Sequence, residues 1–404
     1  MHEKTQSRYR WVIHGLLISA QLSIGINVLA PAPLFPFIME EYGLARGSVS
    51  VLIAVMALVL AVGNVPSGFM AARFGVYRTF ALGSFLMSAG MLAPFMTNFA
   101  GHVLWRIALG LGVGIVIPLV GGVSSQWFGR RELPIINGTN WMGQTSGMAI
   151  SMFLAVPIAN LFGWKVAIFT FGVVALIGTI AWVLLGKNGI NQEQVGNTKA
   201  RSNLSGVLKE RTTGLIAMAF VGPFLAYLSL NAWLPTYYNE VFGMSLSKAG
   251  LIIGLAPLVG LIASPAAGLL SGKLGLRRPF LIGAGVLFII SGFGSFLVHN
   301  EPLIYISVIG LGISQWVFIP MIFIVATELP GKTPSEVAVV LSAGLAVGNL
   351  LSFMGPLLVG VTTDAFGSYL PSFSVLAVLP ILMILSGFML PETGPRNGTP
   401  AQFI

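Results

Sequence analysis

One permanent positive charge stands in an otherwise apolar stretch of the chain, VLWRIALGLGVGIVIPLVGG at residues 103–122. It belongs to Arg106, whose guanidinium stays protonated at any ordinary pH. An arginine near the middle of a bilayer costs at least ~2.5–3.5 kcal/mol unless it faces protein or water. Two roles are therefore open. Arg106 lines a cavity, where it holds an anionic substrate or couples to a proton-carrying group, or it bonds to carbonyls of neighbouring helices and holds them together.

Glycines follow Arg106 at helical spacing. Gly110 and Gly114 come four and eight residues later, so all three positions lie near one face of a helix. A pair of small residues four apart lets another helix backbone approach closely. The sequence therefore predicts that Arg106 lies over a close contact between helices.

The acidic residues give no obvious proton carrier. None of the 12 Asp and Glu residues lies clearly at the centre of an apolar stretch. Glu40, Glu41 and Glu240 fall near one end of such stretches, and Glu328 falls near the other. Three alternatives for proton or sodium coupling are therefore open. The protein works without coupling, or a glutamate at a helix end carries the proton, or the substrate anion itself brings the proton.

Neutral polar side chains inside apolar stretches are the other candidates for contact with a solute: Asn27, Gln144, Tyr227, Asn231 and Gln315. Each could hydrogen-bond a substrate hydroxyl or carboxylate. For any single Asn or Gln, however, a hydrogen bond between helices, worth ~0.6 kcal/mol on average, is the favoured interpretation. With four His and no Cys, we expect no metal site and no cofactor.

The composition places the chain in a membrane. Of its 404 residues 55% are hydrophobic and 8% are charged, whereas soluble domains carry about 25% charged residues. Apolar runs of about 20 residues, the length that spans a bilayer, occur twelve times. They cover residues 11–38, 48–72, 77–98, 103–126, 134–158, 165–186, 213–239, 246–271, 279–298, 302–328, 334–360 and 371–390.

Positive residues orient this map. Arg46, Lys165 and Lys248 fall on one side and Arg106 within a span, which leaves 17 of the 21 Lys and Arg on the side of both termini. The positive-inside rule predicts cytoplasmic termini in a multi-pass protein of the cell (inner) membrane. The net charge of +9 is then a signal of topology, and no nucleic-acid partner is expected. The polar segment 187–212 predicts a cytoplasmic linker between two six-helix bundles, 1–186 and 213–404.

Two short loops repeat at matching places in the two halves. The first is GFMAARFGVYR at residues 68–78, and the second is GLLSGKLGLRR at residues 268–278. They share Gly, a basic residue, Gly and further basic residues at the same spacing. Parallel repeats of six spans, with a binding site at mid-membrane, are typical of secondary transporters.

The chain thereby resembles the major facilitator superfamily. The loops resemble its motif A, matched by Gly68, Arg73, Gly75, Arg78, Gly268, Lys273, Gly275 and Arg278, but with Ala72 and Gly272 where the family has Asp. The fourth span resembles its motif B at Arg106, Gly110, Gly112 and Gly114. The resemblance implies an all-α membrane fold of twelve helices. It also implies that the spans carrying Asn27, Arg106, Tyr227, Asn231 and Gln315 line a cavity, with Gln144 beside it.

We therefore expect a secondary or facilitative transporter, such as a symporter, that moves a small polar organic solute, for example a carboxylate, by alternating access. We expect a monomer in the lipid bilayer. The alternative is a drug/proton antiporter that exports hydrophobic compounds. The exporters' motif C has a Gly-Pro pair, whereas GQTSGMAISM at residues 143–152 lacks that proline. An enzyme is not expected, because the spans hold no paired carboxylates and no Ser/His/Asp arrangement.

Overall fold

The computed structural model describes residues 8–129, 132–189 and 204–394, and within these ranges every regular element is a helix. The chain divides into two compact units. The first comprises Met1–Leu44 with Val51–Thr198, and the second comprises Ala45–Ser50 with Lys199–Ile404. Most of the predicted linker, residues 190–203, lies outside the described residues.

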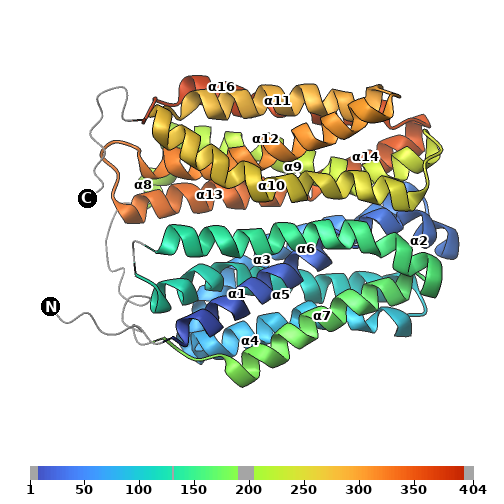
Figure 1. Cartoon of the computed structure of the whole chain (residues 1–404), viewed down its shortest axis with the longest axis horizontal. Helices are drawn as coiled ribbons and strands as arrows, with labels where there is room; N and C mark the ends of the chain where they lie inside the picture. Colours follow the sequence, from blue (N-terminus) through green and yellow to red (C-terminus); the bar gives the residue numbers. More distant parts are fainter. Residues whose placement is uncertain (1–7, 130–131, 190–203, 395–404) are drawn as a thin grey trace. The chain divides into compact units, whose positions relative to one another are not determined.

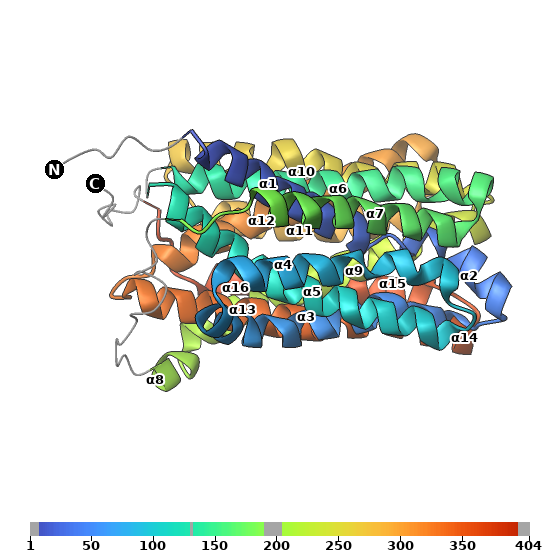
Figure 2. The ribbon, with the colours of Figure 1, turned by 90° about the horizontal axis from the view of Figure 1, so that it is seen from below.

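In both units long helices run side by side (Figure 1). The first unit contains α1 (Arg10–Val28), η1 (Ala32–Leu34), α2 (Phe35–Tyr42), most of α3 (Arg46–Phe74), α4 (Val76–Met87), η2 (Ser88–Phe95), α5 (Phe99–Trp127), α6 (Leu133–Phe162) and α7 (Trp164–Leu185). The second unit contains the first turn of α3, α8 (Leu204–Leu208), α9 (Arg211–Glu240), α10 (Leu246–Leu274), α11 (Arg278–Leu297), α12 (Glu301–Thr327), α13 (Pro334–Ser352), α14 (Met354–Phe366), α15 (Leu370–Val378) and α16 (Ile381–Met389). The short α8 lies beside α9 and α13 at one end of its bundle (Figure 2).

Eleven segments of the described chain are long and apolar enough to cross a membrane, where the sequence predicts twelve. The difference is the expected span at residues 77–98. It consists of α4 followed by the 3₁₀ segment η2, with Pro94 inside it. The short helices α15 and α16, by contrast, together form one of the eleven segments. Hydropathy reports how apolar a segment is, and it does not distinguish an α-helix from a helix that tightens halfway.

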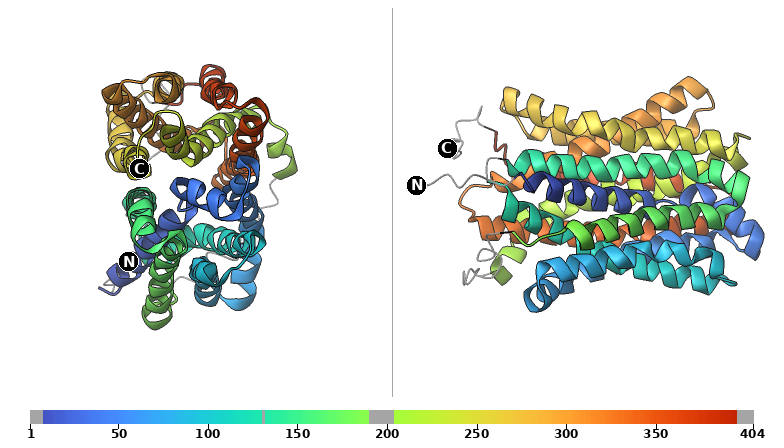
Figure 3. Two further views of the ribbon diagram at one scale, coloured as in Figure 1. Left: turned by 90° about the vertical axis from the view of Figure 1, so that its right-hand side faces the viewer. Right: turned by 60° about the horizontal axis from the view of Figure 1, so that its bottom comes forward.

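Long helices of the first unit, coloured from blue to green, run along one another in the right-hand view of Figure 3, and glycine contacts set the spacing of three of them. A Cβ on Gly112 would lie 2.5 Å from the Gly83 carbonyl oxygen of α4, and one on Gly114 would lie 2.7 Å from the Leu60 carbonyl oxygen of α3. A Cβ on Gly110 would lie 2.9 Å from the Met56 carbonyl oxygen of α3. Three glycines of α5 thus bring two neighbouring backbones close to the helix that carries Arg106.

The outer surface is apolar where a soluble protein would be polar. Phe69, Phe95 and Leu161 are each more than 70% exposed. Exposed side chains of this size are stable against lipid tails and not against water. This surface agrees with the spans in placing the protein in a bilayer.

Candidate functional site

Arg106 is completely buried in the first unit, and its hydrogen-bond partners are all backbone carbonyls. Its Nε–H donates to the Leu52 oxygen at 2.6 Å. Its two terminal nitrogens donate to the Asn27 and Val28 oxygens, both at 2.8 Å. No acidic residue of the described chain bonds to it, so its positive charge is solvated without being neutralised.

The two carbonyls of Asn27 and Val28 belong to the last turn of α1. Such carbonyls have no intrahelical partner and carry the negative end of the helix dipole. Arg106 therefore stabilises the end of α1 and ties it to α3 through Leu52. This geometry is the helix-holding role, and it leaves two of the five guanidinium N–H groups without a carbonyl partner.

A chain of aromatic and imidazole groups leads away from Arg106. The guanidinium carbon lies 5.3 Å from the centroid of the Trp105 ring. The Trp105 indole N–H donates to His102 Nδ1 at 3.2 Å, and His102 Nε2 lies 2.9 Å from the Tyr42 hydroxyl. Because Nδ1 accepts, the neutral ring carries its proton on Nε2. His102 is not among the predicted site residues, since one histidine in an apolar stretch gives no pattern.

The other predicted polar residues of the first unit lie near the ends and contacts of α1. The Asn27 side-chain amide donates to the Ser23 and Phe171 carbonyl oxygens at 2.9 and 3.2 Å. Gln144 of α6 is 9% exposed, and Gln21 of α1 is buried. Among the described residues, neither side-chain Oε1 has a hydrogen-bond partner. Buried polar atoms without partners are costly, so each is a candidate for contact with a ligand.

The second unit holds a further group of unpartnered polar atoms. Within the described residues Gln315 Oε1 on α12 is buried without a hydrogen-bond partner, and Tyr227 Oη on α9 and Trp316 Nε1 on α12 have no partner other than each other. The Tyr227 and Trp316 rings meet edge to face, with centroids 6.5 Å apart. Gly260 of α10 leaves room for the indole, because a Cβ there would overlap it. Asn231 donates to the Tyr227 carbonyl oxygen of its own helix at 2.8 Å and bonds to no other helix among the described residues.

The basic residues of the first repeated loop are exposed. The side chains of Arg73 and Arg78 are both exposed, and neither has an ion-pair partner in the part of the chain that the structure describes. Gly68 has open space around its Cβ position, and Gly75 has a φ of +84°, a backbone conformation that favours glycine.

In the second loop Gly275 also has a positive φ, +64°, but its ψ is 28° where that of Gly75 is 151°, so the two backbones turn differently. Gly268 is again open. Lys273 is exposed. Arg278 differs from its counterpart Arg78: its Nε–H and a terminal nitrogen donate to the Gly387 and Phe388 carbonyl oxygens in the last turn of α16.

The residue before it, Arg277, is 8% exposed and forms a two-bond ion pair with Glu328 at 3.0 and 2.9 Å. It also donates to the Ser271 carbonyl oxygen at 2.6 Å. The Glu392 carboxylate accepts the backbone N–H groups of Arg277 and Arg278 at 2.8 and 3.1 Å, and so caps the start of α11. The sequence analysis placed Glu328 at a helix end but did not pair it.

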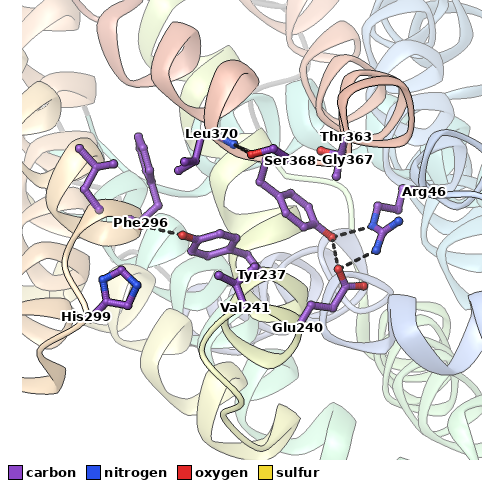
Figure 4. A pocket seen from close by; sticks show the side chains of 12 residues that line it. Arg46, Tyr237, Glu240, Val241, Phe296, His299, Thr363, Gly367, Ser368 and Leu370 are labelled. Atoms are coloured by element: carbon purple, nitrogen blue, oxygen red, sulfur yellow. Dashed lines mark hydrogen bonds and ion pairs between the residues drawn. The ribbon is translucent and has the colours of Figure 1, made fainter.

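At the other end of the second unit is a cavity of about 670 Å³. Its lining includes the aromatic rings of Tyr237, Phe296 and Tyr369 and the charged pair Arg46 and Glu240, as Figure 4 shows. The Arg46 guanidinium donates to Glu240 Oε2 at 2.8 Å and to the Tyr369 hydroxyl at 3.0 Å. Burial raises the pKa of Tyr369, so its hydroxyl keeps the proton that it donates to Glu240 at 2.9 Å.

Within the described residues no three His, Asp or Glu side chains gather into a metal-binding group.

Comparison with known proteins gives a consistent picture. A family model described as Major Facilitator Superfamily matches residues 17–343. A probable L-galactonate transporter of Escherichia coli is 27% identical over 240 residues, which cover 55% of this chain and 53% of that protein. A probable nitrate transporter of Staphylococcus haemolyticus is 24% identical over 364 residues, covering 88% and 90%. Among solved structures, a mutant of the nucleoside transporter NupG is similar in fold, with a TM-score of 0.77 at 11% identity, covering 95% of this chain and 100% of that one.

Proposed function

Because the chain belongs to the major facilitator superfamily, and is thus a multi-pass membrane transporter of small solutes and not an enzyme, we propose that its solute is a small organic anion. The anion crosses the membrane by alternating access, with the two repeated halves moving around a central site. The proposal covers both uncoupled transport and symport with a proton or sodium ion, and it includes cytoplasmic termini in the inner membrane.

The observation that carries the proposal is the charge balance around Arg106. A buried cation with only neutral carbonyl partners leaves a positive potential in the first unit, and low-dielectric surroundings strengthen its effect on an entering anion. Two of its N–H groups are free of carbonyl partners, and a carboxylate matches the planar guanidinium. An organic cation entering the same region would be repelled.

The neutral polar atoms support an organic solute over an inorganic ion. Tyr227, Gln315 and Trp316 supply a hydroxyl, an amide oxygen and an indole N–H, which among the described residues have no partner outside this group. Hydroxyl groups of a solute would satisfy such donors and acceptors. The names of the galactonate and nitrate transporters are those of anion carriers, which agrees with the sign of the charge, and galactonate is in addition a hydroxylated carboxylate.

A thermal-shift and uptake experiment tests the proposal. The purified protein is screened in detergent against galactonate, glutamate, nitrate and hydrophobic cations. Uptake of the same solutes, radiolabelled, is then measured in proteoliposomes that contain the protein. A ligand at ~100 times its dissociation constant stabilises by about 2.7 kcal/mol. We expect a carboxylate to stabilise the protein and to be transported.

Three arginine variants test the role of the Arg106 charge. Arg106→Gln should lose the carboxylate response and at least tenfold of the uptake, while Arg106→Lys, which keeps the charge, should retain part of both. Arg73→Gln removes an equal charge from an exposed position and should behave as the unmodified protein. Stabilisation by hydrophobic cations alone would contradict the proposal and favour the drug/proton antiporter.

A further inference from the structure

His102 reaches Arg106 through one intervening side chain, that of Trp105. The chain reads HVLWR at residues 102–106, so His102 and Trp105 are three residues apart and are neighbours on the surface of α5. Trp105 and Arg106 are consecutive, and consecutive side chains of a helix do not face each other. The contact between the indole and the guanidinium, 5.3 Å from ring centroid to guanidinium carbon, therefore depends on how the indole is turned.

The imidazole of His102 fixes that turn in its neutral form. The indole N–H, which can only donate, gives its hydrogen bond to Nδ1 at 3.2 Å. The Nε2–H then donates to the Tyr42 hydroxyl oxygen at 2.9 Å. His102 and Trp105 are 0% and 3% exposed, so water does not compete for these bonds. A second proton on Nδ1 would point at the indole N–H, and the bond that holds the indole would be lost.

Side chains of α2 and α7 hold the imidazole in turn. The Lys165 ammonium lies 5.5 Å from the centroid of the Tyr42 ring and 2.6 Å from Glu41 Oε1. The Trp164 indole N–H donates to Glu41 Oε2 at 2.6 Å, and its ring lies 4.9 Å from that of His102. A protonated imidazole would be a second cation beside Lys165, so these surroundings also suit the neutral ring.

We propose that His102 is a positioning residue for Arg106: by holding the Trp105 indole against the guanidinium, it sets how tightly the protein binds an anionic solute. The inference rests on the proposed function, which assigns the anion to Arg106. An aromatic ring attracts a cation without neutralising it. If the indole swung away, water could fill its place, solvate the two N–H groups that lack carbonyl partners and weaken the attraction for an anion.

Uptake kinetics in proteoliposomes test the proposal, with radiolabelled galactonate, or glutamate if that is the carboxylate taken up. His102→Leu removes both hydrogen bonds, and we expect it to raise KM at least fivefold while kcat stays within twofold. His102→Gln supplies an amide oxygen and an amide N–H in place of the two ring nitrogens. It should bring KM back to within twofold of the unmodified protein. An unchanged KM in His102→Leu, or an equal rise in both variants, would overturn the proposal.

A tryptophan variant and its matched control separate this hydrogen bond from a general loss of packing. Trp105→Phe keeps an aromatic ring and removes the N–H, and it should raise KM as His102→Leu does. The double variant should be no worse than either single one, because both changes break the same bond. Trp182→Phe removes an indole N–H that donates to the Tyr77 carbonyl oxygen at 3.1 Å in the same unit, and it should leave KM unchanged. Multiplied effects in the double variant would overturn the proposal.

Fluorine NMR of protein labelled with 5-fluorotryptophan tests the hold on Trp105 without any solute. The Trp105 signal is the one that disappears in Trp105→Phe. In His102→Leu it should shift or broaden, and in His102→Gln it should keep its position. A signal that does not change in His102→Leu would overturn the proposal. If the signal responds as expected but none of the screened carboxylates is taken up by the unmodified protein, the proposed function fails, while the hold of His102 on Trp105 stands.

Discussion

Arg106 in the first unit and Arg277 in the second are both buried arginines, but their charges are handled in opposite ways. Arg277 is neutralised by the two-bond ion pair with Glu328. Arg106 has three carbonyl partners and no acid in the described chain. Burial of a guanidinium therefore needs hydrogen-bond acceptors, and it does not need a counter-charge.

The difference separates a structural role from one that is available for function. An ion pair satisfies both of its members, so Arg277 and Glu328 present little net charge to anything else. The carbonyls around Arg106 satisfy its geometry and leave its field in place. If the positive potential around Arg106 serves an anion, removing the Arg106 charge should impair the function of the first unit. Breaking the Arg277–Glu328 pair should instead lower the stability of the second unit.

The largest expected loss of stability comes from breaking the pair. Glu328→Gln leaves Arg277 as a buried charge without its counter-charge, which should cost about 3–5 kcal/mol of unfolding free energy. A denaturant titration in detergent measures it. Glu132→Gln is the matched control, because the Arg10–Glu132 pair is more exposed and such pairs contribute about 0–1 kcal/mol. Equal losses in the two variants would remove the contrast between them.

A smaller effect is expected from pushing α5 away from α3. A Cβ on Gly114 would lie 2.7 Å from the Leu60 carbonyl oxygen and 2.9 Å from the Gly63 Cα, so Gly114→Ala forces the two backbones apart at a cost of about 1–3 kcal/mol. Gly121→Ala on the same helix meets nothing within 4 Å. It should be neutral or stabilising by up to about 1 kcal/mol. The same titration compares them, and equal effects would show that close packing does not hold Arg106 in place.

The smallest effect is expected at the first repeated loop. Arg73→Gln removes an exposed side chain with no ion-pair partner among the described residues, and should change the unfolding free energy by no more than about 0.5 kcal/mol. Arg277→Gln, in the second loop, leaves Glu328 unpaired and should cost several times as much. A large loss in Arg73→Gln would reveal a partner for the first loop that differs from those described.

The sequence predicts the fold well because spanning length and apolarity are local properties. The all-helical membrane architecture is confirmed. The span at 77–98 was expected to be one helix, and it is divided between α4 and η2 because the backbone tightens from Ser88 onward. Hydropathy does not reveal this 3₁₀ segment, although Gly90 and Pro94 lie within it.

The site was less accessible to sequence reasoning. A search for acids near Arg106 finds none, because its partners are carbonyls that every residue possesses. The Asp364 carboxylate accepts the backbone N–H groups of Arg46 and Gly47 at the start of α3. No local sequence pattern connects positions 46 and 364. A comparison of the two repeats would have pointed to this cap, since Ala45 stands where the second half has the capping Ser245.

The clamp that Glu392 forms on the start of α11 has a practical consequence for handling the protein. Arg278 in turn holds the last turn of α16, so the segment after that helix is fastened to the bundle at both ends of a short loop. A fluorescent or affinity tag joined after Gly394 leaves these bonds intact. A shortened chain that stops at Met389 loses Glu392 and should give a lower yield of folded protein.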